Sequence, residues 1–299
     1  MNEQTWKEII EDARWAPSGY NAQPWLFAID GETMTLYSRP ERWRPVIDPR
    51  NRDFLIAIGA LAHSLRVAAA ARGNRLREEW LLRSPFDETL ARFTLQPMEV
   101  SRIDELEALR SVRTWRREYR HEPIPIEDLE AIRGVSGEAG EIAVKGSGIF
   151  RQIAESSVTA AVTHANDRDI YTELVPYLYH PKRNQEQEWG VVSPISEREG
   201  ARLLIWNRFS TPRTPLGKGY RAGTITDTRD LLHQAPALII LRGDSEEPMS
   251  LVEVGARYQA LRLEAHRRGL VTQPVSVLPQ IAARSEERRV GKECPSPCR

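Results

Sequence analysis

One sixteen-residue stretch occurs twice in this chain, and it restricts the possible folds more strongly than any other feature. Residues 58–73 and 254–269 align without gaps at an offset of 196, and seven of the sixteen positions are identical, including both glycines. Each copy ends on a glycine, which is typical of a long helix with a glycine at C′. Small residues such as Gly59 would let another helix approach closely. We interpret the repeat as an internal duplication and predict two related halves, residues 1–100 and 101–283.

The rest of the pattern mixes helices with strands, which places the chain in the α+β class. The Asp30-Gly31 pair between two apolar runs predicts a hairpin with strands over residues 25–29 and 33–37. Residues 235–241 form an apolar run that predicts a short buried strand. Helices are expected over residues 4–14, 53–72, 106–119, 148–165, 195–207 and 254–269, with another beginning in 124–129, and loops over 181–190 and 212–228.

The composition of the 299 residues narrows the classes of partner. Lysine and arginine together number 42, as do aspartate and glutamate, so the formal net charge is zero. This balance argues against a nucleic-acid or anionic-membrane partner. No run of 18 apolar residues is present and the first residues are charged, so we expect no membrane span, no secretory signal and a cytoplasmic location. The six histidines show no metal-ligand spacing, so no metal site is predicted.

The C-terminal residues are treated separately. The string from Arg284 to Cys294 resembles the translation of a sequencing-library adapter, so we regard residues 284–299 as an artefactual tail and exclude them. Both cysteines, Cys294 and Cys298, lie in this tail. The remaining chain then offers no disulfide, cysteine nucleophile or cysteine metal ligand. We expect the natural second half to continue beyond Ile281.

The segment before the hairpin reads Ala-Pro-Ser-Gly-Tyr-Asn-Ala-Gln-Pro-Trp, from Ala16 to Trp25. Its two prolines exclude a regular helix or central strand. Gly19 and Asn21 tolerate positive φ. Two interpretations remain open from the residues alone. The loop is either a helix-to-strand turn whose Ser18 and Asn21 bond their own backbone, or a stiff polar loop that binds a flat heteroaromatic ligand.

A basic cluster lies in the second half, at Arg113, Thr114, Arg116 and Arg117. On a helix the three arginines would share a face at spacings of three and four residues. A hydroxyl group with guanidinium groups is suited to a phosphate dianion. A solvated charged face is the alternative interpretation.

Both segments carry a family resemblance. Residues 16–25 resemble the A-P-S-x-x-N-x-Q-P-W motif of the FMN-dependent nitroreductases. Residues 113–125 resemble the R-R-T-x-R-R-x-[FY]-x-x-x-P-x-P segment of the tandem-repeat, Acg-like branch of that family. In ordinary members of the family, the matching motif binds the FMN phosphate. Val112 stands where the first arginine is expected, and Arg110 to Arg113 offers a second register of the motif.

The resemblance implies a nitroreductase-like FMN-binding fold in which the two halves form a fused pseudo-dimer. It implies an FMN-dependent oxidoreductase that moves a hydride from NAD(P)H to a nitroaromatic or a quinone, with no catalytic side chain of its own. The alternative is a protein that only sequesters FMN, under a lid formed by residues 212–228. One site per chain is expected, in a pseudo-dimeric monomer or a homodimer. The implied cofactor-binding residues are Pro17, Ser18, Gly19, Asn21, Gln23, Arg113, Thr114, Arg116 and Arg117.

Overall fold

The structure is a computed structural model that describes residues 3–116, 118–120, 122–137, 140–179, 191–192 and 218–282. Three predicted features lie outside these residues: the loop over 181–190, the helix over 195–207 and the tail over 284–299. Of the loop predicted over 212–228, the first six residues also lie outside. The rest of that prediction is wrong, because helix α8 (Lys218–Gln234) begins at Lys218.

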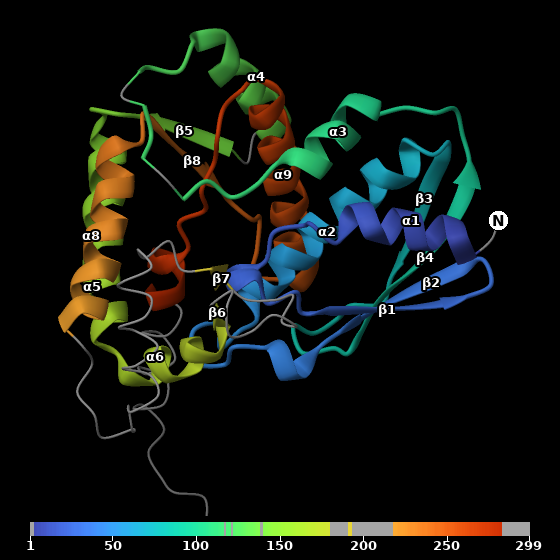
Figure 1. Ribbon diagram of the computed structural model, residues 1–299, viewed down its shortest axis with the longest axis horizontal. Coiled ribbons are helices and arrows are strands. Elements are labelled where there is room, and N and C mark those ends of the chain that lie inside the picture. Colours follow the sequence, from blue (N-terminus) through green and yellow to red (C-terminus); the bar gives the residue numbers. More distant parts are fainter. Residues whose placement is uncertain are drawn as a thin grey trace, which may run out of the picture.

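The first half is a helix, a four-stranded antiparallel sheet and a long central helix (Figure 1). The predicted hairpin is confirmed: β1 (Trp25–Asp30) pairs with β2 (Thr33–Ser38) around Gly31, which has a φ of 59°. Strands β3 (Asn74–Trp80) and β4 (Thr89–Pro97) were not predicted, and they extend the sheet in the order β1-β2-β4-β3. The predicted helices are confirmed as α1 (Glu3–Ala13) and α2 (Arg52–Ala70).

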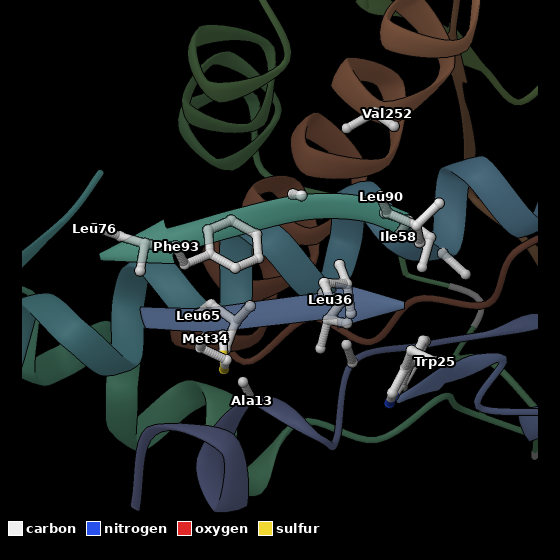
Figure 2. Close-up of a cluster of buried hydrophobic side chains, with 14 of the residues drawn as sticks. Ala13, Trp25, Met34, Leu36, Ile58, Leu65, Leu76, Leu90, Phe93 and Val252 are labelled. Carbon is white, nitrogen blue, oxygen red and sulfur yellow. The ribbon is translucent and has the colours of Figure 1, made fainter. Parts of the chain in front are cut away.

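Helix α2 is the centre of the core. It packs against the sheet through residues such as Ile58 and Leu65, which meet Met34, Leu36 and Phe93 of the strands (Figure 2). By length and composition α2 could cross a membrane, which the sequence analysis did not anticipate, but 78% of its most apolar 18-residue window is buried inside the fold. That burial is what a core helix of a globular protein requires.

The opposite side of α2 packs against α9 (Pro248–Arg267), the second copy of the repeat. A Cβ atom on Gly59 would lie 1.8 Å from the carbonyl oxygen of Val252, and one on Gly255 would lie 1.9 Å from that of Ile56. At the repeat offset of 196, Val252 is equivalent to Ile56 and Gly255 is equivalent to Gly59. In each helix, therefore, the glycine meets the carbonyl group at the same repeat position of the other helix. The predicted close approach of a second helix is confirmed, and its partner is the other copy.

The second half has a smaller sheet, with β5 (Gly140–Val144) antiparallel to β8 (Ala237–Leu241). Helices α5 (Gly148–Asn166) and α8 pack against each other (Figure 1). The helix predicted over residues 148–165 and the helix that begins at residues 124–129 are confirmed. The strand predicted within residues 235–241 is confirmed as β8, but all its residues are only partly buried, so the prediction of a buried strand is wrong in that respect. The remaining elements are α3 (Ile103–Ser111), α4 (Ile126–Ser136), α6 (Arg168–Leu174), the parallel pair β6 (Leu178–Tyr179) and β7 (Val191–Val192), and three 3-10 turns, η1 (Gly19–Asn21), η2 (Pro40–Arg42) and η3 (Val175–Tyr177).

The helix predicted over residues 106–119 is wrong at its C-terminal end. Helix α3 stops at Ser111, and Val112 has extended backbone angles, with φ −61° and ψ 132°. Beyond it, the backbone N–H of Trp115 donates to the carbonyl oxygen of Thr272 at 3.1 Å. A tertiary hydrogen bond has replaced the local helical one. Arg113 and Arg116 therefore do not share a helix face.

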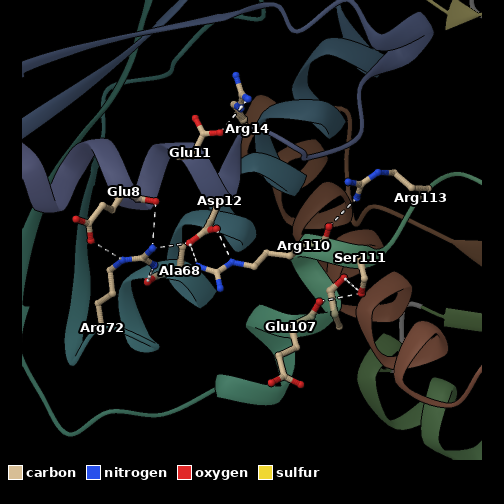
Figure 3. Close-up of polar contacts among 11 residues, drawn as sticks. Glu8, Glu11, Asp12, Arg14, Ala68, Arg72, Glu107, Arg110, Ser111 and Arg113 are labelled. Atoms are coloured by element: carbon tan, nitrogen blue, oxygen red, sulfur yellow. Dashed lines mark hydrogen bonds and ion pairs between the residues drawn. The ribbon is translucent and has the colours of Figure 1, made fainter.

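A buried carboxylate joins the first three helices (Figure 3). Asp12 of α1 accepts hydrogen bonds from Arg72, at 2.5 Å, and from Arg110 of α3, at 2.7 and 3.0 Å. Burial raises the pKa of Asp12, but the hydrogen bonds from Arg110 and Arg72 outweigh it and hold the pKa below the usual 3.8. The ionised carboxylate is thus the form that the fold stabilises.

We expect Asp12→Asn to lower the free energy of unfolding at neutral pH by about 1–3 kcal/mol, because both guanidinium groups lose their counter-charge. Since the folded pKa is depressed, the contribution is present above pH 3.8 and is lost as the pH falls through the folded pKa. Urea denaturation at pH 7 and pH 3 measures both effects. The adjacent Glu11→Gln is the control, because the exposed Glu11–Arg14 pair contributes less than about 0.5 kcal/mol. Equal losses in the two variants would contradict the prediction.

Candidate functional site

The loop from Pro17 to Trp25 has an unusual backbone. Tyr20, Asn21 and Gln23 have φ values of 54°, 51° and 48°. They are three of the five non-glycine residues with positive φ in the described part of the chain. Such angles cost about 1 kcal/mol or more each and gather at ligand-binding sites. The strain is an observed reason to regard this loop as functional.

Hydrogen bonds inside the loop hold this conformation. The backbone N–H of Gln23 donates to the Ser18 hydroxyl oxygen at 3.0 Å, and that of Asn21 donates to the Ser18 carbonyl oxygen at 2.9 Å. Ser18 therefore bonds its own backbone, as the turn interpretation expects, and its hydroxyl can also donate one hydrogen bond. Asn21 is exposed, whereas Pro17, Ser18, Gly19 and Gln23 are partly buried.

Two arginines that were not predicted as site residues contact the loop. A guanidinium nitrogen of Arg42 donates to the carbonyl oxygens of Ala22 and Gln23, at 2.8 and 3.3 Å. Arg44 fills the space that a side chain on Gly19 would need, since a Cβ there would lie 2.4 Å from its Nη2. Glycine at position 19 therefore allows the Arg44 guanidinium group to pack against the loop backbone. The cluster of arginines over residues 39–52 was the available signal.

Arg44 is itself notable because it is only 5% exposed and its Nη1 has no hydrogen-bond partner among the described residues. Its guanidinium carbon lies 5.2 Å from the centre of the Tyr20 ring, within cation–π range. Burial raises the pKa of Tyr20 to about 12, although the charges of Arg44 and Arg116 act in the opposite direction. The negative charges of Asp53 and Glu173 raise the pKa further, so Tyr20 is a neutral phenol among charges of both signs.

The basic segment folds back onto the start of this loop. The guanidinium carbon of Arg113 lies 4.5 Å from the centre of the Trp15 ring, directly before the loop. Its Nη1 also donates to the carbonyl oxygens of Arg110 and Val112, at 3.0 and 2.8 Å, at the end of α3 (Figure 3). Arg113 therefore anchors the segment, a structural role that the phosphate interpretation did not predict.

Arg116 adds a positive charge to this region. It is exposed, and its positive charge is close enough to the hydroxyls of Tyr20 and Tyr258 to act on the pKa of each. Thr114 lies between Arg113 and Arg116 in sequence and is partly buried, while Arg117 lies outside the described residues. The fold thus joins two segments that are 98 residues apart in sequence, through the contact of Arg113 with Trp15.

Helix α9 adds two residues that the sequence analysis also missed. Arg262 is 3% exposed, and its Nη1 donates to the side-chain oxygen of Gln259 at 3.3 Å. Burial raises the pKa of Tyr258, and the charges of Arg262 and Arg116 lower it. Neither the Nε of Arg262 nor the hydroxyl of Tyr258 has a hydrogen-bond partner within the described residues. Buried donors without acceptors are costly, so this arrangement suits an anionic ligand.

Comparison with known proteins finds distant relatives. No protein-family model matches the chain. A Mycobacterium tuberculosis protein (strain H37Rv) with the provisional name NAD(P)H nitroreductase Rv3131 is 23% identical over 285 residues, which cover 93% of this chain and 78% of that protein. A second, provisionally named NAD(P)H nitroreductase acg, is 23% identical over 273 residues, covering 89% of this chain and 78% of that protein.

The chain is a distant homologue of these proteins. A third relative, an uncharacterised protein of Mycobacterium tuberculosis (strain CDC 1551), is 27% identical over 289 residues, which cover 91% of this chain and 39% of that protein. The homology agrees with the mixed α+β fold and its antiparallel sheets. It supports a nitroreductase-like oxidoreductase, and the individual cofactor-binding residues stay predictions.

The residues that are present fit a flavin mononucleotide. A flat ring with polar edges would meet the exposed Asn21 amide and the backbone of a stiff loop, and a phosphate would meet arginines that lack an acceptor. The buried Nη1 of Arg44, which packs against Gly19, is a donor without a hydrogen-bond partner in the part of the chain that the structure describes. These features agree with an anionic, hydrogen-bonding, planar ligand.

Proposed function

We propose that this chain is an FMN-dependent oxidoreductase of the nitroreductase type. It moves a hydride from NAD(P)H to an electron-poor acceptor such as a nitroaromatic or a quinone. The observation that carries the proposal is the stacking of Arg113, in the basic segment 113–116, on Trp15, which precedes the strained loop 17–25. Support also comes from the provisional nitroreductase names of the homologues.

In this proposal the chain binds and orients, and bound FMN supplies the redox chemistry. Ser18, Gly19 and Asn21 contact the ring or the ribityl chain, with Pro17 and Gln23 stiffening the loop. Thr114 and Arg116 hold the phosphate, together with Arg117, which lies outside the described residues. Arg113 contributes positive charge while it anchors the segment on Trp15.

We also propose that the two halves, residues 1–100 and 101–283, are related as the subunits of a symmetric dimer. The reciprocal glycine contacts of α2 and α9 support this arrangement, because equivalent positions meet across the crossing. The first half supplies the loop and the second half supplies the arginines. One FMN per chain follows from that division.

The test uses the purified chain loaded with FMN under anaerobic conditions. Visible flavin absorbance is recorded after addition of NADPH, of NADH and then of dithionite. Bleaching by either dinucleotide is the expected result. Flavin that only dithionite reduces would contradict turnover and favour sequestration of FMN. A chain that binds no FMN would refute both.

A further inference from the structure

Arg262 is a buried cation with no counter-ion among the described residues. It is 3% exposed, and its Nη1 donates to the neutral side chain of Gln259. Removing a guanidinium from water without a partner costs several kcal/mol. Proteins pair a buried guanidinium group with an anion. We therefore expect an anion to bind beside Arg262.

The first copy of the repeat contains an equivalent arginine that is paired with a carboxylate. Arg66 occupies the position equivalent to Arg262, 196 residues earlier. Its Nε and Nη2 bind the two carboxylate oxygens of Glu78, at 2.5 and 2.8 Å. Glu78 comes from β3, the strand that follows α2 directly. The arginine of the first copy thus forms a bidentate ion pair with a carboxylate.

The described part of the second copy has no such carboxylate. Position 274, which is equivalent to Glu78, is a proline, and the sequence from Leu270 to Ala283 contains neither aspartate nor glutamate. The Nε of Arg262, whose equivalent in Arg66 binds Glu78, has no acceptor in the described part of the chain. The arginine is thus present in both copies, whereas the described residues pair it with a carboxylate in the first copy alone.

Apart from the Gln259 oxygen, the groups that we find to act on Arg262 and Tyr258 among the described residues are hydroxyls and positive charges. Tyr258 lies one turn earlier on α9, and its buried hydroxyl has no partner within the described residues. The charge of Arg113 acts on Arg262, and that of Arg116 acts on Tyr258. Tyr119 lies close enough to Tyr258 to be affected by it. A ligand with several negatively charged oxygens would satisfy this set, and a phosphate monoester dianion has that chemistry.

We propose that Arg262 and Tyr258, with Arg116 and Arg113, form a binding site for a phosphate monoester dianion, which replaces the carboxylate that Glu78 provides in the first copy. The inference rests on the proposed function where FMN is the source of the phosphate. Inorganic phosphate is a second source of the same chemistry. Arg262 and Tyr258 are additional to the residues that the sequence motifs indicate.

The first experiment compares FMN with riboflavin, which lacks the phosphate. Dissociation constants of both are measured by flavin fluorescence for the unaltered chain and for Arg262→Met. We expect the variant to lose tenfold or more in affinity for FMN and to keep its affinity for riboflavin. An unchanged preference for FMN over riboflavin would overturn the inference that Arg262 binds the FMN phosphate, while leaving the proposed function intact.

The matched control is Arg66→Met, the equivalent change in the first copy. It leaves Glu78 unpaired, so its melting temperature should fall, while its preference for FMN should not change. Arg262→Met removes an unpaired buried charge, so its melting temperature should not fall. Should Arg262→Met not fold, Tyr258→Phe removes one hydroxyl only and is expected to reduce FMN affinity severalfold without affecting riboflavin.

A second experiment separates the two sources of phosphate. The melting temperature is measured with inorganic phosphate and with chloride at equal ionic strength. Phosphate should stabilise the unaltered chain and not Arg262→Met. Stabilisation by phosphate with no flavin binding would keep the site and refute the proposed function. No stabilisation by phosphate, together with an unchanged FMN preference, would refute the site.

Discussion

Gly255→Ala is expected to disrupt the packing of the two long helices and to lower the free energy of unfolding by about 3 kcal/mol or more. The added Cβ would lie 1.9 Å from the carbonyl oxygen of Ile56 and 2.7 Å from its carbonyl carbon. These are backbone atoms of α2, which is held between the sheet and α9, so no side-chain rotation can relieve the overlap. Urea denaturation followed by circular dichroism measures the loss.

Gly134→Ala is the control for helix propensity. Gly134 lies inside α4, and a Cβ there would meet no atom within 4 Å. Alanine is the better helix former by about 0.5–1 kcal/mol, so this variant should be slightly more stable. If Gly255→Ala were as stable as the unaltered chain, the close crossing of α2 and α9 would be wrong.

Gly59→Ala tests the reciprocity of the crossing. Its Cβ would lie 1.8 Å from the carbonyl oxygen of Val252, so a loss similar to that of Gly255→Ala is expected. Because both changes separate the same two helices, their effects should not add in the double variant. Additive losses would show that the two contacts are independent, against the arrangement of equivalent positions described above.

Arg116→Gln is expected to weaken FMN binding by about 10- to 100-fold, the usual value of one charge-assisted hydrogen bond. Arg116 is exposed, and its positive charge acts on Tyr20 of the loop and on Tyr258 of α9. Its removal should therefore leave the melting temperature of the flavin-free protein unchanged. Flavin fluorescence titration gives the affinity, and raising the salt concentration should reduce the difference between the two proteins.

Arg120→Gln is the matched control, since Arg120 is exposed on the same segment four residues later. It changes the net charge equally and should leave FMN affinity within about twofold of that of the unaltered chain, because long-range charge is screened. Equal weakening by the two variants would mean that general charge attracts the ligand. A specific phosphate contact at Arg116 would then be refuted.

Much of the fold was predictable because local signals agreed with tertiary contacts. The Asp30-Gly31 turn predicted its hairpin, and the repeated glycines predicted two helices that approach closely. Strands β3 and β4 were missed although buried Leu76 alternates with the exposed Arg75 and Arg77 in β3. Many charged residues on the outer face hid that alternation.

The site was harder to predict, because its decisive contacts join distant parts of the chain. The expected helical face of arginines does not exist, since Arg113 bonds the end of α3 and stacks on Trp15. Arg44 and Arg262 gave no motif signal, and their importance follows from burial with guanidinium nitrogens that have no hydrogen-bond partner among the described residues. The repeat did offer one clue, because Arg262 keeps the identity of Arg66.

The central claim is that loop 17–25 and segment 113–116 form one flavin site in each chain. The measurement that tests it most directly is a titration of the flavin-free protein with FMN, with flavin fluorescence recorded against the ratio of FMN to chain. We predict a break at one FMN per chain, and the loss of that break in a variant that combines Asn21→Ala with Arg116→Gln. Absence of binding, or the same break in that variant, would contradict the claim.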